Sequence, residues 1–145
     1  MRETMPQELT ITARQMAIAN PRPGPGLVRY ARANTEPGLD VWVVENGLCN
    51  RVVGATSYPR LDGWDRPRYL RAHLGVVADT VAAGVPLTAY LHWTLADNYE
   101  WGSYEPRFGL YGIERSDDKV VWSDLDAMGH DAAGAYRELI ARMRG

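Results

Sequence analysis

Two short apolar runs, Leu39–Val44 and Val85–Trp93, constrain the fold of this chain more than any other feature of its sequence. The first run is rich in β-branched residues, and its length suits a buried strand of a parallel sheet. The second has the same character, and Pro86 is tolerated because it stands near the start of the strand. An amphipathic stretch between the runs predicts a helix. The order strand, helix, strand predicts an α/β fold with right-handed crossovers.

The helix between the two strands has start and stop signals in the sequence. Pro67 suits the first turn of a helix, and Gly84 is the expected C-terminal cap. Apolar residues between them recur at spacings of four, three and four, which predicts a single buried helical face. The residues on that face are Leu70, Leu74, Val77 and Val81.

The N-terminal segment, residues 1–26, is expected to be irregular because it ends in a run rich in Pro and Gly. Within this segment we expect one short helix around Thr12–Ala19. A second short helix is expected over Leu27–Ala33, at the start of the main body of the chain, 27–145.

Both predicted strands are followed by long loops, Leu48–Asp65 and Thr94–Arg107. After the second loop we expect an extended segment over Phe108–Ile113, with Val120–Trp122 pairing back as a hairpin. The S-x-x-D pattern of residues 123–126 predicts the start of a last helix. The buried face of this helix is expected to comprise Met128, Ala132, Tyr136, Leu139 and Met143.

Charge and composition exclude several classes of protein. The net charge of −2, without a basic patch, argues against a nucleic-acid partner. Cys49 is the single cysteine, which rules out an internal disulfide and favours a reducing, cytoplasmic compartment. We expect no secretory signal and no membrane span, because no apolar stretch approaches about 18 residues. Metal-ligand spacings and Gly-rich phosphate loops are absent from the sequence, so no metal or cofactor is expected.

Candidate functional residues follow the two strands, because α/β barrels carry their chemistry at the C-terminal ends of strands. Glu45 ends the first strand, and the second runs into a cluster that holds two carboxylates, an amide and two indoles within residues 93–101. Such a mixture suits a sugar, which needs hydrogen-bond partners and a flat ring to stack on.

Structural readings of these residues remain open at this point. A Glu before Asn-Gly is usually a solvated turn residue, and Trp93 is more often part of a core than a ligand platform. Asp97 and Asn98 suit caps of a loop or helix end, and His92 fits a structural role within the strand. Cys49 lies near Glu45, but a lone cysteine without a placed base is weak evidence for a nucleophile.

Four motifs, in order along the chain, resemble glycoside hydrolase family 1. Val44-Glu45-Asn46-Gly47 is similar to the nucleophile motif that ends the seventh strand of that family's (β/α)8 barrel. The segment 65–74 is similar to the start of the following helix. Residues 93–101 match the family's W-S-L-x-D-N-F/Y-E-W motif, with Thr94 in place of Ser, and residues 107–110 match R-F-G-L. The resemblance covers about Leu27 to the C-terminus.

The resemblance implies a fold and a set of roles. The fold is the C-terminal part of a (β/α)8 barrel, about strands seven and eight with their helices, which is incomplete as a barrel by itself. Glu45 is the implied nucleophile of a retaining β-glycosidase, and the implied substrate is a β-glycoside or oligosaccharide. The family places Trp93 under the sugar ring and Glu100 on its hydroxyls. Its indole N–H donor and its wall residue correspond to Trp101 and Phe108.

One family motif is missing. The family's acid/base Glu lies in an N-E-P motif after the fourth strand, and no N-E-P occurs in this sequence. We therefore expect a segment of a β-glucosidase-like enzyme that is inactive alone and whose partner is the remaining part of the barrel. The alternative is a non-catalytic remnant that binds a sugar or a protein.

Overall fold

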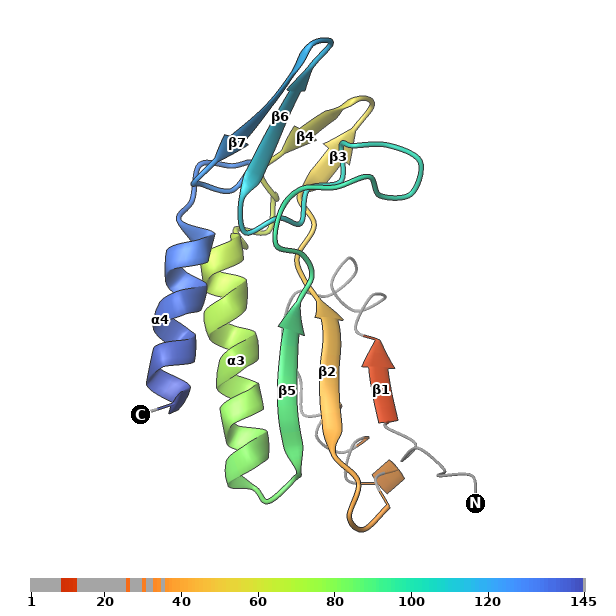
Figure 1. The fold of residues 1–145 in the computed structure, drawn as a ribbon, viewed down its shortest axis with the longest axis vertical. Coiled ribbons are helices and arrows are strands. Elements are labelled where there is room, and N and C mark those ends of the chain that lie inside the picture. The colour runs from red at the N-terminus through yellow and green to blue at the C-terminus, as the bar shows by residue number, and fades with distance from the viewer. Residues whose placement is uncertain (1–8, 13–25, 27–29, 31–32, 35, 145) are drawn as a thin grey trace.

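The computed structural model describes residues 9–12, 26, 30, 33–34 and 36–144. Its elements form one α/β body, with a parallel sheet at one end and two antiparallel hairpins at the other (Figure 1). In chain order the elements are β1 (Leu9–Thr12), β2 (Val41–Asn46), β3 (Arg51–Val53), β4 (Thr56–Tyr58), α3 (Arg66–Ala82), β5 (Leu87–His92), β6 (Gly112–Ser116), β7 (Lys119–Ser123) and α4 (Ala132–Arg144).

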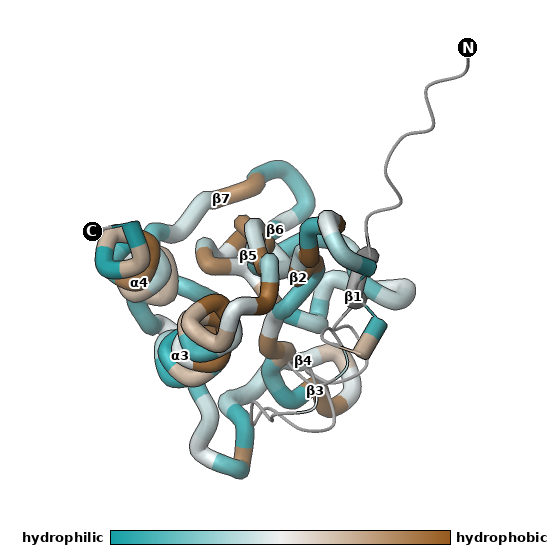
Figure 2. Tube along the Cα trace, turned by 90° about the horizontal axis from the view of Figure 1, so that it is seen from below, coloured by the Kyte–Doolittle hydropathy of each residue, from teal (hydrophilic) through white to brown (hydrophobic). Residues whose placement is uncertain are grey.

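The parallel sheet has the strand order β1-β2-β5, so β2 is its central strand. β1 pairs with β2 in the register Leu9↔Val41, and β2 pairs with β5 in the register Val41↔Leu87. Both apolar runs are therefore neighbouring parallel strands, as the sequence predicts. Helices α3 and α4 lie next to each other beside β5 (Figure 2).

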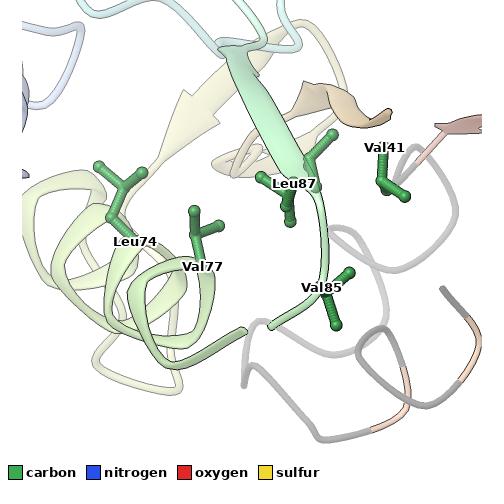
Figure 3. Packing of buried hydrophobic residues seen from close by; sticks show 6 residues of the cluster. Val41, Leu74, Val77, Val85 and Leu87 are labelled. Atoms are coloured by element: carbon green, nitrogen blue, oxygen red, sulfur yellow. The ribbon is translucent and has the colours of Figure 1, made fainter. Parts of the chain in front are cut away.

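The main core lies between α3 and the strands β2 and β5 (Figure 3). Leu74 and Val77 of α3 pack with Val41, Val85 and Leu87 of the sheet region. Removing each such aliphatic side chain from water stabilises the fold by about 1.5–3 kcal/mol. A second cluster joins α3 to α4 and contains Leu70, Leu110, Ala132 and Ala133.

Helix α3 begins and ends where the sequence predicts. The side chain of Asp65 caps its start by accepting from the backbone N–H of Arg68 at 2.7 Å. Gly84 follows its end with a φ of +81°, a backbone conformation that Gly adopts without strain. The predicted face is wrong at Val81, which is 47% exposed. Thr80 is buried instead. Its hydroxyl donates a hydrogen bond to the carbonyl of Val76 at 2.6 Å, and this bond replaces the one that water would make.

Two expectations for the N-terminal half need correction. Segment 1–26 is not wholly irregular, since Leu9–Thr12 forms β1 and completes the edge of the sheet. Thr12 belongs to that strand, and the rest of the helix expected over Thr12–Ala19 lies outside the described residues. Most of the helix expected over Leu27–Ala33 also lies outside them. The loop expected over Leu48–Asp65 contains the hairpin β3–β4, which turns at Gly54 with a φ of +59°.

The C-terminal half contains a hairpin in which Val120–Trp122 pairs back as predicted, but its first strand is Gly112–Ser116 and shares only residues 112–113 with the extended segment expected over Phe108–Ile113. The start of the last helix also differs from the prediction. β6 and β7 pair in antiparallel register, with Ile113 opposite Trp122. The last helix does not begin at residues 123–126 but at Ala132, where the side chain of Asp131 accepts from the N–H of Gly134 at 2.7 Å. Met128 therefore precedes the helix, and Met143 is 46% exposed. Among the described helices, none has the length and apolar character needed to cross a bilayer.

Candidate active site

Both hairpins and their connecting loops lie at the end of the sheet toward which β2 and β5 point (Figure 1). This is the C-terminal edge of the parallel strands, where α/β barrels place their chemistry. Glu45 lies at this edge on β2, and the polar–aromatic cluster begins there at the end of β5.

Glu45 occupies an irregular position in β2. Val43 pairs with Tyr90 and Asn46 pairs with His92, so β2 uses one residue more than β5 over this interval. Such a bulge re-aims a side chain, and bulges are common beside active sites. Glu45 has a φ of +55°, an uncommon conformation for a non-Gly residue and a known mark of functional sites. Its side chain is partly exposed.

Asn46 and Gly47 attach the end of β2 to the start of the cluster. The backbone N–H of Trp93 donates to the carbonyl of Asn46 at 3.0 Å. A Cβ added to Gly47 would overlap the carbonyl oxygen of Trp93 and lie 3.4 Å from Cδ1 of Phe108. Only Gly fits this approach, so the nucleophile-like motif rests directly against two of the predicted sugar-binding residues.

Trp93 and Glu100 form one hydrogen-bonded unit. The indole N–H of Trp93 donates to Oε1 of Glu100 at 2.7 Å. Glu100 is 4% exposed, and its backbone exchanges two hydrogen bonds with Ser103 at 2.8 and 3.1 Å. The carboxylate is thereby held in a fixed orientation beside the indole ring. This contact spans only seven residues of the chain, across the loop that follows β5.

Trp101 and Phe108 meet edge to face, with ring centroids 5.6 Å apart and an interplanar angle of 84°. Phe108 is buried, whereas Trp101 is 51% exposed and has a φ of +49°. Trp101 also borders a cavity of about 490 Å³. The loop and hairpin after β2 also line that cavity, through residues that include Cys49, Asn50, Arg51 and Arg60. All four predicted sugar-binding residues therefore lie in one region beside Gly47.

Asp97, which the sequence suggests as a loop cap, organises the return of the chain toward β6. Its Oδ1 accepts from the N–H of Gly109 at 2.9 Å, and its side chain is buried. Arg107 lies 3.4 Å from the other carboxylate oxygen and donates to the carbonyl of Ile113 at 2.7 Å. These contacts hold the segment that carries Phe108 in place, so the structural reading of Asp97 is correct.

A buried ion pair between Arg66 and Asp126 is the main feature of the site region that sequence reasoning missed. The guanidinium Nη1 lies 2.6 Å from Oδ2 of Asp126, and both side chains are 1% exposed. Nη2 of Arg66 donates to the carbonyls of Leu48 and Arg107 at 3.2 and 2.9 Å. Arg66 therefore links the loop after β2 to the residue before Phe108. The pair joins positions 60 residues apart, which no local pattern reveals.

His92 and Cys49 have the structural character expected of them. Burial lowers the pKa of His92 to about 3, so its imidazole is neutral at physiological pH. Burial raises the pKa of the Cys49 thiol to about 11, against a smaller lowering by a hydrogen bond with the backbone of Arg107 and by the nearby charge of Arg66. A protonated thiol is a poor nucleophile. In the part of the chain that the structure describes, no group of three metal-ligating side chains is placed to hold a metal ion.

Comparison with known proteins places the chain in a family. The family model for glycosyl hydrolase family 1 matches residues 25–142. The chain belongs to glycosyl hydrolase family 1. A β-galactosidase of Sulfolobus acidocaldarius is 34% identical over 103 residues, which are 70% of this chain and 18% of that protein. β-Glucosidase A of Thermotoga maritima is 36% identical over 87 residues, or 59% of this chain and 19% of that protein.

The fold agrees with this membership. A crystal structure of a β-glucosidase from Exiguobacterium marinum superimposes with a TM-score of 0.60 at 29% identity, over 87% of this chain and 27% of that one. Enzymes of glycosyl hydrolase family 1 are (β/α)8 barrels and hydrolyse glycosides. The 145 residues span less than a fifth of these two curated relatives and about a quarter of the matching structure.

Proposed function

We propose that this segment supplies the nucleophile side of a retaining β-glycosidase site, with Glu45 forming the covalent glycosyl-enzyme. The single observation that supports this most is the close approach of Gly47 to Trp93, because it joins the nucleophile motif to the sugar-binding cluster. Glu45 is the residue that the bulge re-orients, and it lies at the C-terminal edge of the parallel sheet. Retaining glycosidases need an ionised carboxylate at this place to attack the anomeric carbon.

The glycone site of the proposal consists of Trp93, Glu100, Trp101 and Phe108. Trp93 offers a ring face for the sugar, and Glu100 accepts hydrogen bonds from sugar hydroxyls. The hydrogen bond between these two side chains supports their joint role, since it fixes the carboxylate beside the ring. Trp101 contributes its indole N–H, and Phe108 forms the apolar wall against which Trp101 rests.

The proton donor comes from outside these 145 residues. In a retaining enzyme, the second carboxyl group lies about 5–5.5 Å from the nucleophile. The sequence has no N-E-P motif, so we propose that the remaining strands of the barrel supply this acid/base residue. In this proposal the segment is the C-terminal portion of the barrel and acts on a β-glycoside or oligosaccharide. Among the residues that the structure describes, β1 and β5 are the edge strands of the parallel sheet, and we propose that the remaining strands of the barrel pair there.

The test joins this segment to the N-terminal portion of Thermotoga maritima β-glucosidase A, and circular dichroism confirms that the chimera is folded. A 2-deoxy-2-fluoro glycoside that traps the intermediate should label the peptide bearing Glu45. Glu45→Gln should remove the label and lower turnover by several orders of magnitude. The matched control, Glu36→Gln, lies on an exposed turn and should change neither.

The 145-residue chain alone provides a second, independent measurement. It supplies one of the two required carboxylates, so it should hydrolyse no aryl β-glycoside above the buffer rate. Label on Glu100 instead of Glu45 in the folded chimera would overturn the assignment of the nucleophile. A folded chimera without any label would favour the alternative, a non-catalytic remnant that binds a sugar or a protein.

A further inference from the structure

We infer that Tyr90 is a positioning residue for the nucleophile, because its hydroxyl fixes Asn46 and thereby holds Glu45 in its re-aimed conformation. This inference rests on the proposed function of Glu45 for its catalytic consequence. The hydrogen bond from Tyr90 to Asn46, which we call the lock on the bulge of β2, does not depend on that proposed function.

The first step is the geometry of the lock. The hydroxyl of Tyr90 donates to Oδ1 of Asn46 at 2.7 Å, and Asn46 is 3% exposed. Tyr90 pairs with Val43, immediately before the extra residue of β2, and Asn46 pairs with His92 immediately after it. The hydrogen bond therefore connects the residue of β5 before the bulge with the residue of β2 after it.

The second step is the difference in burial between two neighbouring residues. The bulge interrupts the regular alternation of side chains, and Asn46 is 3% exposed whereas Glu45 is partly exposed. Asn46 is held by the Tyr90 hydroxyl at its side chain and by the N–H of Trp93 at its carbonyl, 3.0 Å away, and the Tyr69 hydroxyl also lies beside its side chain. These contacts restrict Asn46 and therefore the peptide that it shares with Glu45.

The third step is the conformation of Glu45 itself. A φ of +55° is strained for a non-Gly residue and persists only where the surroundings enforce it. The hydrogen bond from Tyr90 to Asn46 is one of the contacts beside this position that enforce it. Without the Tyr90 hydroxyl, the bulge is free to relax, and the Glu45 carboxylate moves away from the anomeric carbon. Misplacement of a reacting group by about 1 Å lowers rates up to about a hundredfold.

Tyr90→Phe tests the inference because it removes one oxygen atom and keeps the buried ring. Tyr136→Phe is the matched control, because the hydroxyl of Tyr136 faces the backbone of β5, with the carbonyl of Tyr90 at 3.4 Å, and takes no part in the hydrogen bond to Asn46. In the 145-residue chain, NMR should show the amide resonances of Glu45 and Gly47 displaced in Tyr90→Phe. In Tyr136→Phe these resonances should keep their wild-type positions.

The kinetic arm uses the chimera described above. In Tyr90→Phe the rate constant for labelling of Glu45 should fall about ten- to a hundredfold. The KM for an aryl glucoside should stay within about twofold, because glycone binding depends on other residues. Unchanged amide resonances, an unchanged labelling rate, or equal losses in both Tyr variants would each overturn the inference. If the wild-type chimera is not labelled at Glu45, the proposed function fails while the NMR comparison still decides whether the lock exists.

Discussion

Arg66 and Asp126 form an ion pair that is almost completely withdrawn from solvent, with 2.6 Å between Nη1 and Oδ2. A buried pair of charges is stable only when further hydrogen bonds satisfy both groups. Here Arg66 also donates to two backbone carbonyls, and Oδ1 of Asp126 accepts from the N–H groups of Met128 and His130, each at 2.9 Å. The ion pair therefore connects the start of α3 with the site loops and with the segment that leads into α4.

Asp126→Asn should destabilise the chain strongly, because it leaves the Arg66 guanidinium buried without its counter-charge. Loss of one partner of a buried pair typically costs about 3–5 kcal/mol. The matched control is Asp62→Asn, which breaks the partly exposed pair with Arg60 and should cost about 0–1 kcal/mol. Urea unfolding of the two variants and the wild type measures the difference. Equal, small changes in both variants would show that Asp126 does not hold the site loops.

Gly47→Ala should also destabilise the chain and disrupt the site, because its Cβ would overlap the carbonyl oxygen of Trp93. The collision involves backbone, so the end of β2 and the start of the cluster must move apart. Gly75→Ala, in the exposed middle of α3 with nothing within 4 Å of the new Cβ, provides the opposite control. It should stabilise the helix by up to about 1 kcal/mol. Thermal melts should therefore shift in opposite directions, and a shift in the same direction would contradict the packing described.

The elements that the sequence predicted well are those defined by local patterns. The period of α3, its first turn at Pro67 and its stop at Gly84 all depend on residues within one or two turns of each other. β2 and β5 are likewise short apolar runs. Such information is readable because both the pattern and the structure that it specifies are local.

The features that the sequence did not reveal depend on distant partners. The bulge at Glu45 exists only relative to the register of β5, about 45 residues later. The role of Asp126 depends on Arg66, and the pattern that predicted a helix start at residues 123–126 is instead followed by a turn closed by that carboxylate. The hairpin β3–β4 was within reach, since β-branched residues flank Gly54 on both sides. Its strands have only three residues each, which is below the length that periodicity detects.

Cys49 should be unreactive in the folded chain. Burial raises its pKa to about 11, so almost no thiolate is present at pH 8. A disulfide reagent such as Ellman's reagent should react slowly with the native protein and rapidly in urea, where the thiol recovers a pKa of about 8.5. The ratio of the two rates then reports on the integrity of the loop after β2. Rapid reaction of the native chain would show that this loop opens readily.

His92 should make the stability of the chain decrease in acid. Burial lowers its pKa to about 3 in the folded state, whereas an unfolded His has a pKa of about 6.5. Between these two pKa values, the unfolded chain therefore binds a proton at His92 and the folded chain does not. The stabilisation from the neutral imidazole is complete above pH 6.5 and is lost as the pH falls from there toward 3, with a slope of up to about 1.4 kcal/mol per pH unit.

His92→Phe keeps a ring beside Tyr136, 5.9 Å away in the wild type, and removes the titrating group. Urea unfolding between pH 7 and pH 4 should give a shallower decline for this variant than for the wild type. Parallel declines in the wild type and His92→Phe would contradict the prediction, because they would mean that His92 is protonated in the folded chain as readily as in the unfolded chain.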